Sequence, residues 1–294
     1  MRLLLGTRGS RLARTQSGHV ADLLRALGHA VELEIIQTRG DAEQGRPVPE
    51  LGGKGLFTAE LEAALLSRRV HLAVHSLKDL PTDDAAGLIV AAVPPREDPR
   101  DALVSRGSTL KELPAGARVG TASLRRRALL KRRRGDLEVV DLRGNVDTRI
   151  RKVHEGELDA VILAAAGVRR LGREDVIVEY LDFLPAPAQG ALAVQACGDR
   201  EDVLAALRPL HDEETARCTR AERVLLAVLE GGCSVPVGAL AVASAATLTL
   251  RGIVASPDGS RALEADAAGD DPEALGRDVA AQLLAQGAEE ILNA

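Results

Sequence analysis

Hydrophobic and polar positions alternate in two rhythms along the first part of the chain, and together they predict a series of strands and helices. Residues 3–5 form a short apolar run, and residues 31–35 alternate apolar with acidic side chains, as strands do. Between them, apolar residues recur at helical spacing over residues 10–27, and Gly28 marks the end of that helix. A helix near residues 56–67 precedes the apolar runs VHLAVH and LIVAAV. The order strand, helix, strand, helix, strand predicts a parallel-rich α/β sheet.

A second alternation of the same kind follows a segment, residues 94–101, that is dense in proline and charge and predicts a linker. The runs ALVS, ARVG, LEVVDL and DAVILAA predict strands, and helices are expected from Ser123 and from about Val146. We therefore expect a second α/β domain. Residues 184–190 predict another crossover, after which the run ALAVQA is expected to return as a strand to the first domain.

The pattern changes from His211 onward and predicts a small α+β domain. A long helix is expected to end at Glu230, and short strands are expected around a turn at Pro257-Asp258-Gly259. An amphipathic helix, about residues 272–292, closes the chain. The predicted fold class is thus two α/β domains and a small α+β C-terminal domain. The predicted boundaries are 1–94 with 190–208 for the first domain, 98–186 for the second and 211–294 for the third.

Composition narrows the class of protein. The 294 residues are 46% hydrophobic and 28% charged, with a net charge of −5. No window approaches the roughly 20 apolar residues of a membrane span, and the N-terminus has no signal-peptide core, so we expect a cytoplasmic protein. Three cysteines without zinc-ligand spacing disfavour a disulfide scaffold, structural zinc or any other metal site. Aromatic residues are nearly absent, which disfavours binding of nucleic acid by base stacking.

Hydroxyl, glycine and basic residues follow the predicted strand ends at five places. Glycine lets backbone N–H groups reach an anion, helix N-termini attract it, and arginine or lysine supplies the opposite charge. Each loop alone also fits a helix cap, a turn or a solvated surface. Their repetition at one topological position predicts a single ligand that carries several negative groups. The five loops are TRGS (7–10), TRGD (38–41), SLKD (76–79), TASLRR (121–126) and RGN (143–145).

Two further residues stand out by their setting. Asp79 is a carboxylate among many bases, suited to orient a donor or to stabilise a cation, although a surface ion pair with Lys78 explains it equally well. Cys233, between two glycines and a proline at a helix end, predicts an exposed thiol that serves as a nucleophile or an attachment point, or simply fills a loop. Cys197 and Cys218 fit core positions, and His75 fits a strand-end core histidine.

These residues together closely resemble the porphobilinogen deaminase (hydroxymethylbilane synthase) family. The resemblance runs in family order through the whole chain. It implies three domains, of which the first two are similar to periplasmic binding proteins and the third carries a cofactor cysteine. The matching motifs are TRGS, TRGD, GGKGLF (52–57), HSLKDLP (75–81), EDPRDA (97–102), GTASLRR (120–126), LRGNVDTR (142–149), AGVRRLG (166–172) and ERVLLAVLEGGCSVPVG (222–238).

The resemblance also implies an activity and its residues. In that family a dipyrromethane cofactor, joined by a thioether to the loop cysteine, here Cys233, primes the stepwise addition of four porphobilinogen molecules with loss of ammonia. Asp79 would be the catalytic carboxylate that stabilises the cation left when ammonia departs. The family also suggests a monomer that acts on a small molecule. The residues expected to hold cofactor and substrate carboxylates are Arg8, Ser10, Lys54, Ser76, Lys78, Thr121, Ser123, Arg125, Arg126, Arg143, Gly144, Arg149, Arg170 and Gln189, with Gln16 a weaker candidate.

The chain departs from the family pattern at three places. Arg11 stands where proline is usual, Ala122 replaces a usual serine, and Pro187-Ala188 replaces a more flexible Val-Gly pair.

Two other classes of function stay open. A non-catalytic anion-binding protein would explain the first two domains but not the Gly-Gly-Cys loop. A nucleic-acid binder would explain the basic run 125–134, but the net negative charge and the missing aromatics oppose it.

Overall fold

The computed structural model describes residues 1–38, 58–83, 85–229, 235–245 and 247–293. The chain divides into two compact units, each built from two stretches of sequence. The first unit comprises Met1–Glu97 and Ala191–Ala216, and the second comprises Asp98–Gly190 and Arg217–Ala294. The predicted boundaries of three domains stay a prediction.

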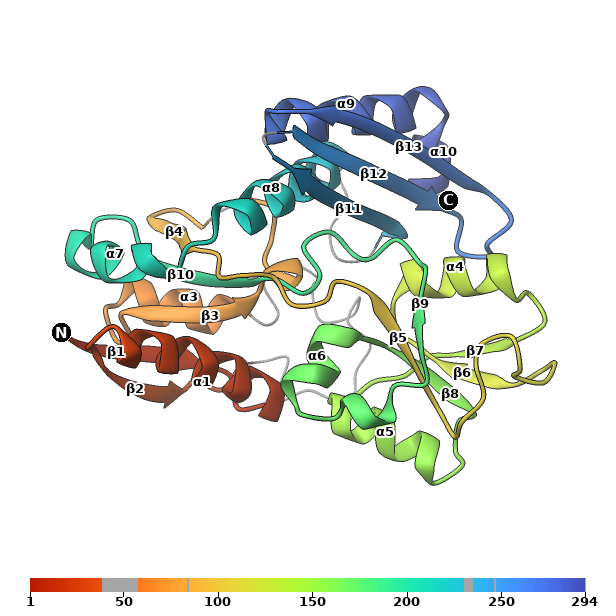
Figure 1. Ribbon diagram of the computed structural model, residues 1–294, viewed down its shortest axis with the longest axis horizontal. Coiled ribbons are helices and arrows are strands. Elements are labelled where there is room, and N and C mark those ends of the chain that lie inside the picture. The colour runs from red at the N-terminus through yellow and green to blue at the C-terminus, as the bar shows by residue number, and fades with distance from the viewer. Residues whose placement is uncertain (39–57, 84, 230–234, 246, 294) are drawn as a thin grey trace. The chain divides into compact units, whose positions relative to one another are not determined.

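Five strands form the sheet of the first unit, in the order β2-β1-β3-β10-β4 (Figure 1). β1 pairs in parallel with β2 and β3, whereas β10 pairs antiparallel with β3 and β4. The prediction that the run ALAVQA returns to the first sheet is therefore confirmed. The strands are β1 (Arg2–Thr7), β2 (Ala30–Ile35), β3 (Leu72–Ser76), β4 (Leu88–Ala92) and β10 (Leu192–Cys197).

The helices of the first unit begin where the sequence provides caps and apolar faces. The Ser10 hydroxyl accepts a hydrogen bond from the Ala13 N–H at 3.3 Å, so α1 starts directly after the loop that follows β1. α1 and α7 pack on one apolar cluster of the sheet, and α3 packs on another. The helical segments are α1 (Arg11–Ala26), α3 (Ala59–Leu66), η2 (Leu77–Asp79), α7 (Glu201–Leu207) and η4 (Arg208–Leu210).

The second unit contains a five-stranded sheet of the order β7-β6-β8-β5-β9. β6 is parallel to β7 and β8, but β5 is antiparallel to β8 and β9, so in each five-stranded sheet one strand runs against the other four. β5 and β10 are the strands that follow the two crossovers, so no strand-helix-strand connection obliges them to run parallel to a neighbour. The strands are β5 (Asp101–Ser105), β6 (Arg118–Gly120), β7 (Glu138–Val140), β8 (Ala160–Ala164) and β9 (Glu179–Leu181).

A three-stranded antiparallel sheet, β11-β12-β13, forms the C-terminal part of the second unit (Figure 1). Helix α9 packs on β12 and β13, and the terminal helix is interrupted at Gly287, whose φ of 95° is left-handed, so α10 begins anew. The elements are α4 (Leu124–Arg133), α5 (Val146–His154), α6 (Ala165–Arg170), η3 (Glu174–Val176), α8 (Glu213–Val228), β11 (Val237–Ser244), β12 (Thr247–Ala255), β13 (Ala262–Gly269), α9 (Pro272–Ala285) and α10 (Ala288–Leu292).

The predicted fold class, two α/β sheets followed by a small α+β part, is confirmed. Asp101 ends the segment that predicts a linker, and it is fully buried as the first residue of β5. In the described ranges no helix is long and apolar enough to cross a membrane, and no cluster of side chains there has the composition of a metal site.

Candidate active site

The first unit places five of the predicted residues after two adjacent parallel strands. Arg8 and Ser10 follow β1, and Ser76, Lys78 and Asp79 lie at or after the end of β3. Because β1 and β3 are parallel neighbours, these residues share the carboxyl edge of the sheet, where α/β proteins bind ligands. The buried Gln16 of α1 donates a hydrogen bond from Nε2 to the Ser76 hydroxyl at 3.0 Å, which links α1 to the end of β3.

Backbone contacts fix the turn that carries Asp79, while the Asp79 carboxylate is exposed. The preceding Leu77 is buried, and its N–H donates to the Ala191 carbonyl at 3.0 Å, so the short helix η2 is anchored to the start of β10. Asp79 itself is exposed, and no described residue donates a hydrogen bond to its carboxylate. The carboxylate is thus placed on a fixed turn with its acceptor oxygens open to a ligand.

His75, one residue before Ser76, is a core residue, as the sequence predicted. It is buried, and burial together with the positive charge of Arg8 lowers the pKa of His75 to about 4. The imidazole is therefore neutral near pH 7. Gln195 of β10 lies on the same side of the sheet and is also fully buried, so the polar groups inside this part of the sheet carry no charge.

The second unit gathers predicted residues after three adjacent parallel strands. Thr121 follows β6, Arg143 and Gly144 follow β7, and Arg170 lies on α6 after β8. Thr121 is buried, and its hydroxyl accepts a hydrogen bond from the N–H of Ser123 at 3.2 Å. The Ser123 hydroxyl in turn caps α4. Arg170 donates to the Gly190 carbonyl at 2.7 Å, which fixes it to the second crossover.

Asp101 reaches the same edge from the opposite direction. β5 runs antiparallel to β8, and Asp101 lies opposite Ala164, the last residue of β8. The first residue of β5 therefore lies beside the carboxyl end of β8. Asp101 was not among the predicted site residues, although a carboxylate directly before the apolar run ALVS was a signal of a buried acid.

A closed network of hydrogen bonds surrounds the Asp101 carboxylate. Arg125 donates from Nη1 at 2.7 Å and from Nη2 at 3.2 Å, and Arg126 donates from Nε at 3.0 Å. Gln189 donates from Nε2 at 2.9 Å and accepts from Arg126 Nη2 at 3.2 Å. Asp101 and Gln189 are fully buried, and the arginines are 3% and 6% exposed. These two arginines are therefore interior groups rather than extended surface arms.

The charge state of Asp101 follows from this network. Burial alone would raise the pKa of Asp101, but the positive charges of Arg125 and Arg126, with hydrogen bonds from Arg125 and Gln189, hold it well below its usual range. Arg125 Nη1 also donates to the Leu184 carbonyl at 2.7 Å. The buried Nε of Arg125 has no acceptor among the described residues.

Positive charge accumulates beside this network. Burial and the positive charges of Arg126 and Arg143 lower the pKa of Arg149 to about 10. Arg149 donates from Nε to the Gly144 carbonyl at 2.8 Å, and Gly144 has a φ of 105°, which an L side chain would strain. Three guanidinium groups that repel one another are stabilised by an anion, so this edge suits a ligand with carboxylates.

The two units bring together different parts of the predicted set. In the first unit the structure assembles Arg8, Ser10, Gln16, Ser76, Lys78 and Asp79, and in the second Thr121, Ser123, Arg125, Arg126, Arg143, Gly144, Arg149, Arg170 and Gln189. Lys54 and Cys233 lie outside the described residues. Cys197 and Cys218 are buried, as predicted. The remaining assignments stay predictions, because burial and hydrogen bonds do not by themselves prove a role in binding.

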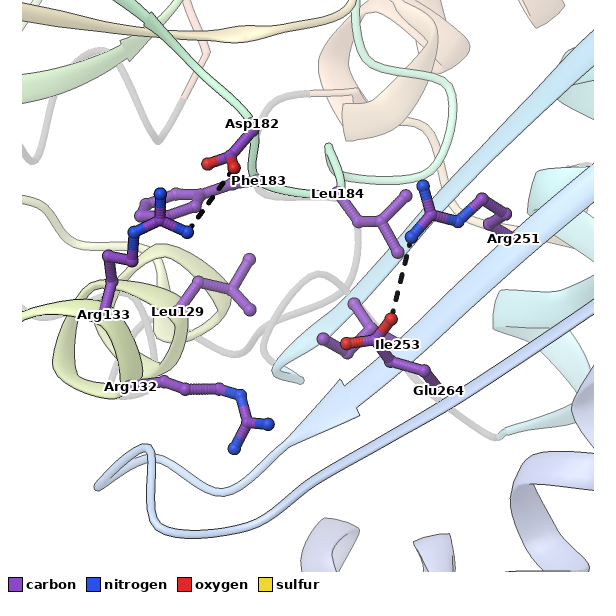
Figure 2. Close-up of a pocket in the computed structure, with 9 residues that line it drawn as sticks. All are labelled: Leu129, Arg132, Arg133, Asp182, Phe183, Leu184, Arg251, Ile253 and Glu264. Carbon is purple, nitrogen blue, oxygen red and sulfur yellow. Dashed lines mark hydrogen bonds and ion pairs between the residues drawn. The ribbon is translucent and has the colours of Figure 1, made fainter.

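A separate cavity of about 460 Å³ lies in the second unit (Figure 2). Four apolar side chains and three arginines line it, and two of the arginines face carboxylates, Arg133 with Asp182 at 3.5 Å and Arg251 with Glu264 at 3.7 Å. None of the predicted site residues lines it. Because these ion pairs already neutralise much of its charge, this cavity is a poorer carboxylate site than the sheet edge. It is lined by Leu129, Arg132, Arg133, Asp182, Phe183, Leu184, Arg251, Ile253 and Glu264.

Comparison with known proteins gives one consistent result. The profile "Porphobilinogen deaminase, dipyromethane cofactor binding domain" matches residues 3–205, and "Porphobilinogen deaminase, C-terminal domain" matches residues 216–285. The porphobilinogen deaminase of Syntrophobacter fumaroxidans is 49% identical and that of Rubrobacter xylanophilus 50%. These alignments cover 98% and 99% of this chain, and 96% of each relative. Among solved structures, the methionine-binding protein MetQ aligns over 73% of this chain and 92% of its own, with 13% identity and a TM-score of 0.47.

Proposed function

The chain belongs to the porphobilinogen deaminase family, and on this premise we propose how its residues carry out the family's reaction. It is a transferase of tetrapyrrole biosynthesis that joins four porphobilinogen molecules head to tail into hydroxymethylbilane and releases ammonia. The assignment of roles to single residues is our proposal. The observation that carries it is the accumulation of guanidinium groups at one sheet edge, where burial and the positive charges of Arg126 and Arg143 lower the pKa of Arg149.

Asp79 is the catalytic carboxylate. Its exposed oxygens accept hydrogen bonds from pyrrole N–H groups and stabilise the positive charge that develops on the substrate as ammonia leaves. The anchored turn η2 matters because a carboxylate that is already fixed in place has no orientational entropy left to lose during the reaction. Lys78 and Ser76, on the same turn and strand end, bind substrate carboxylates.

The carboxylates of cofactor and substrate are bound at the edges of both sheets. A pyrrole of this pathway carries an acetate and a propionate, so each ring presents two anions, and a chain of rings presents many. Guanidinium groups bind carboxylates through paired hydrogen bonds, and hydroxyls and helix N-termini add further donors. This is why one protein needs so many such groups. We assign this role to Arg8, Ser10, Lys54, Thr121, Ser123, Arg125, Arg126, Arg143, Gly144, Arg149, Arg170 and Gln189.

The residues of the second unit fit the dipyrromethane group that the family profile names. Its donors are guanidinium and hydroxyl groups, the buried Arg125 Nε has no acceptor in the described part of the chain, and Arg149 lies among like charges. When bound, the dipyrromethane supplies the pyrrole carbon to which the first substrate is joined. We propose that a thioether to Cys233 attaches it, since the other two cysteines are buried in the core.

A monomeric state and a cytoplasmic location complete the proposal. Both derive from the family resemblance and the composition. Sedimentation of the purified protein tests the first, and a single species of about 31 kDa is the expected result.

The catalytic assignment is tested by Asp79→Asn, which keeps the shape of the side chain and removes its charge. We expect turnover of porphobilinogen to fall by about 100-fold or more, the cost of losing one preorganised electrostatic group. Asp83→Asn is the matched control, because Asp83 is an exposed carboxylate four residues away. The control is expected to keep turnover within about twofold of the parent. Normal turnover in Asp79→Asn would remove Asp79 from its role.

A further inference from the structure

We propose that Asp101 is a positioning residue, which holds Arg125 and Arg126 in the orientation that binds carboxylates of the cofactor and substrate. This inference rests on the proposed function of the sheet edge in the second unit. Asp101 touches no ligand in this account. It acts on the ligand only through the two arginines.

The rigidity of its position supports this role. Asp101 is the first residue of β5, its backbone pairs with β8 and β9, and its side chain is fully buried. An arginine side chain has several rotatable bonds, and ordering it costs free energy at the moment of binding. A fixed carboxylate that holds two guanidinium groups beforehand removes that cost from the binding step.

The donors of Arg125 show how complete the constraint is. A guanidinium has five N–H donors in a rigid planar fork. Three donors of Arg125 are directed to Asp101 and to the Leu184 carbonyl, at 2.7, 3.2 and 2.7 Å. Once these are fixed, the direction of the remaining donors is fixed too, including Nε, which is buried without an acceptor among the described residues. Asp101 thereby decides where the unused donor points.

The arrangement reaches a second arginine and the second crossover. Arg126 donates to Asp101, to the Ile162 carbonyl at 3.0 Å and to Gln189 at 3.2 Å. Gln189 also donates to the Pro99 carbonyl at 2.7 Å, so residues of both crossovers meet at this one carboxylate. The three charged side chains together keep one net positive charge, which remains available to an anion.

Two other roles for Asp101 make different predictions. If it served only to neutralise buried positive charge, any carboxylate at this position would suffice. If it merely competed with ligand carboxylates for the arginines, its removal would strengthen binding. A positioning role requires both the charge and its place, so that Asp101→Asn and Asp101→Glu should both weaken binding.

The experiment compares Asp101→Asn, Asp101→Glu and the control Asp98→Asn. Asp98 lies in the same segment with little exposure, but its ion pairs are with Arg100 and Arg169. Intact mass of each denatured protein gives the fraction that carries the dipyrromethane adduct. Steady-state kinetics then give KM for porphobilinogen and kcat per loaded enzyme, and thermal unfolding shows which variants are folded.

We expect the adduct fraction of both Asp101 variants to fall at least fivefold and KM to rise at least tenfold with a smaller change in kcat. The control should match the parent. A parental adduct fraction and KM in Asp101→Glu would overturn the proposal, as would stronger loading or a lower KM in Asp101→Asn. If Asp101→Asn does not fold, Asp101→Glu, which retains the charge, decides the question. A parent without any adduct would instead contradict the proposed function.

Discussion

The two five-stranded sheets have the same pattern of strand directions but differ in chemistry at one equivalent position. In each sheet the fourth strand is antiparallel to the third, so its first residue lies at the carboxyl edge of the central strands. In the first sheet that residue is Leu192, opposite Ser76. In the second it is Asp101, opposite Ala164. Both are buried, at 2% and 0% exposure.

Topology therefore determines where a side chain lies, but it does not determine what that side chain does. Leu192 packs in the apolar cluster beneath α1, and Asp79, the carboxylate of the first unit that we propose to be catalytic, lies exposed on a turn instead. The carboxylate of Asp101 instead forms ion pairs with two buried arginines. On our proposal, the first unit thus presents a carboxylate to the ligand, whereas the carboxylate of the second unit holds two arginines of the protein itself.

Exchanging the two residues gives the largest expected effect. Asp101→Leu would leave Arg125 and Arg126 buried without their counter-charge, and removing one partner of a buried ion pair typically costs about 3–5 kcal/mol. Leu192→Asp would bury a carboxylate among apolar side chains, with a cost of about 3 kcal/mol or more. Urea unfolding of each variant measures the loss.

A conservative change at Leu192 is the control for these exchanges. Leu192→Met keeps the apolar character and is expected to cost less than about 1.5 kcal/mol. An Asp101→Leu variant as stable as the parent would show that the arginines are satisfied without Asp101. The comparison between the sheets would then lose its physical basis.

Acid stability distinguishes the neutral interior of the first sheet from the charged interior of the second. The pKa of His75 is lowered to about 4 by burial and by Arg8, whereas an unfolded histidine titrates near 6.5. The unfolded chain therefore binds a proton first, and stability falls as the pH drops from about 6.5 to about 4, by at most about 3 kcal/mol. The pKa of Asp101 is also held below its usual range, so the stability from this group is lost only below about pH 4.

His75→Leu separates these two contributions. We expect this variant to lose the dependence between pH 4 and 6.5 and to keep the steeper loss below pH 4. The exposed His19→Gln is the matched control for loss of an imidazole. Urea midpoints measured across this pH range decide it, and an unchanged profile in His75→Leu would show that His75 is not the group responsible.

A smaller effect is expected at the second crossover. Ala188 is buried with a φ of 61°, a left-handed conformation that costs an L residue roughly 1–2 kcal/mol. The first crossover, residues 94–101, has no such residue. Ala188→Gly should relieve the strain but add freedom to the unfolded chain, for a net gain of up to about 1 kcal/mol. A loss of stability in thermal unfolding would contradict this account.

Much of the fold followed from periodicity and caps, because these are local properties. The helix after Ser10 and the helix after Ser123 begin where the hydroxyls cap them, and the return of β10 to the first sheet was predicted. The antiparallel direction of β5 and β10 was not, because strand direction after a crossover depends on contacts far apart in sequence. Gly287 was not recognised as a helix break within an amphipathic stretch, although glycine is a local signal for the left-handed conformation that it adopts there.

The candidate site was predicted as a list of residues but not as a network. The loops at strand ends identified Arg125 and Arg126, since such loops have a recognisable composition, whereas Gln189 was expected only from the family resemblance. Asp101 was overlooked because it appeared as one more charge in a charged linker, and its burial arises only when β5 pairs with β8. Arg125 and Arg126 were expected as ligand contacts, and the structure shows that both are first held by a carboxylate of the protein itself.

The covalent attachment of a dipyrromethane to Cys233 is tested by the intact mass of the purified, denatured protein, compared with the variants Cys233→Ala and Cys218→Ala. A thioether survives denaturation, so the account predicts an excess equal to two porphobilinogens minus two ammonias in the parent. The excess should persist in Cys218→Ala, whose cysteine is buried, and vanish in Cys233→Ala. An excess that remains in Cys233→Ala, or a parent that forms no adduct after incubation with porphobilinogen or hydroxymethylbilane, would contradict the account.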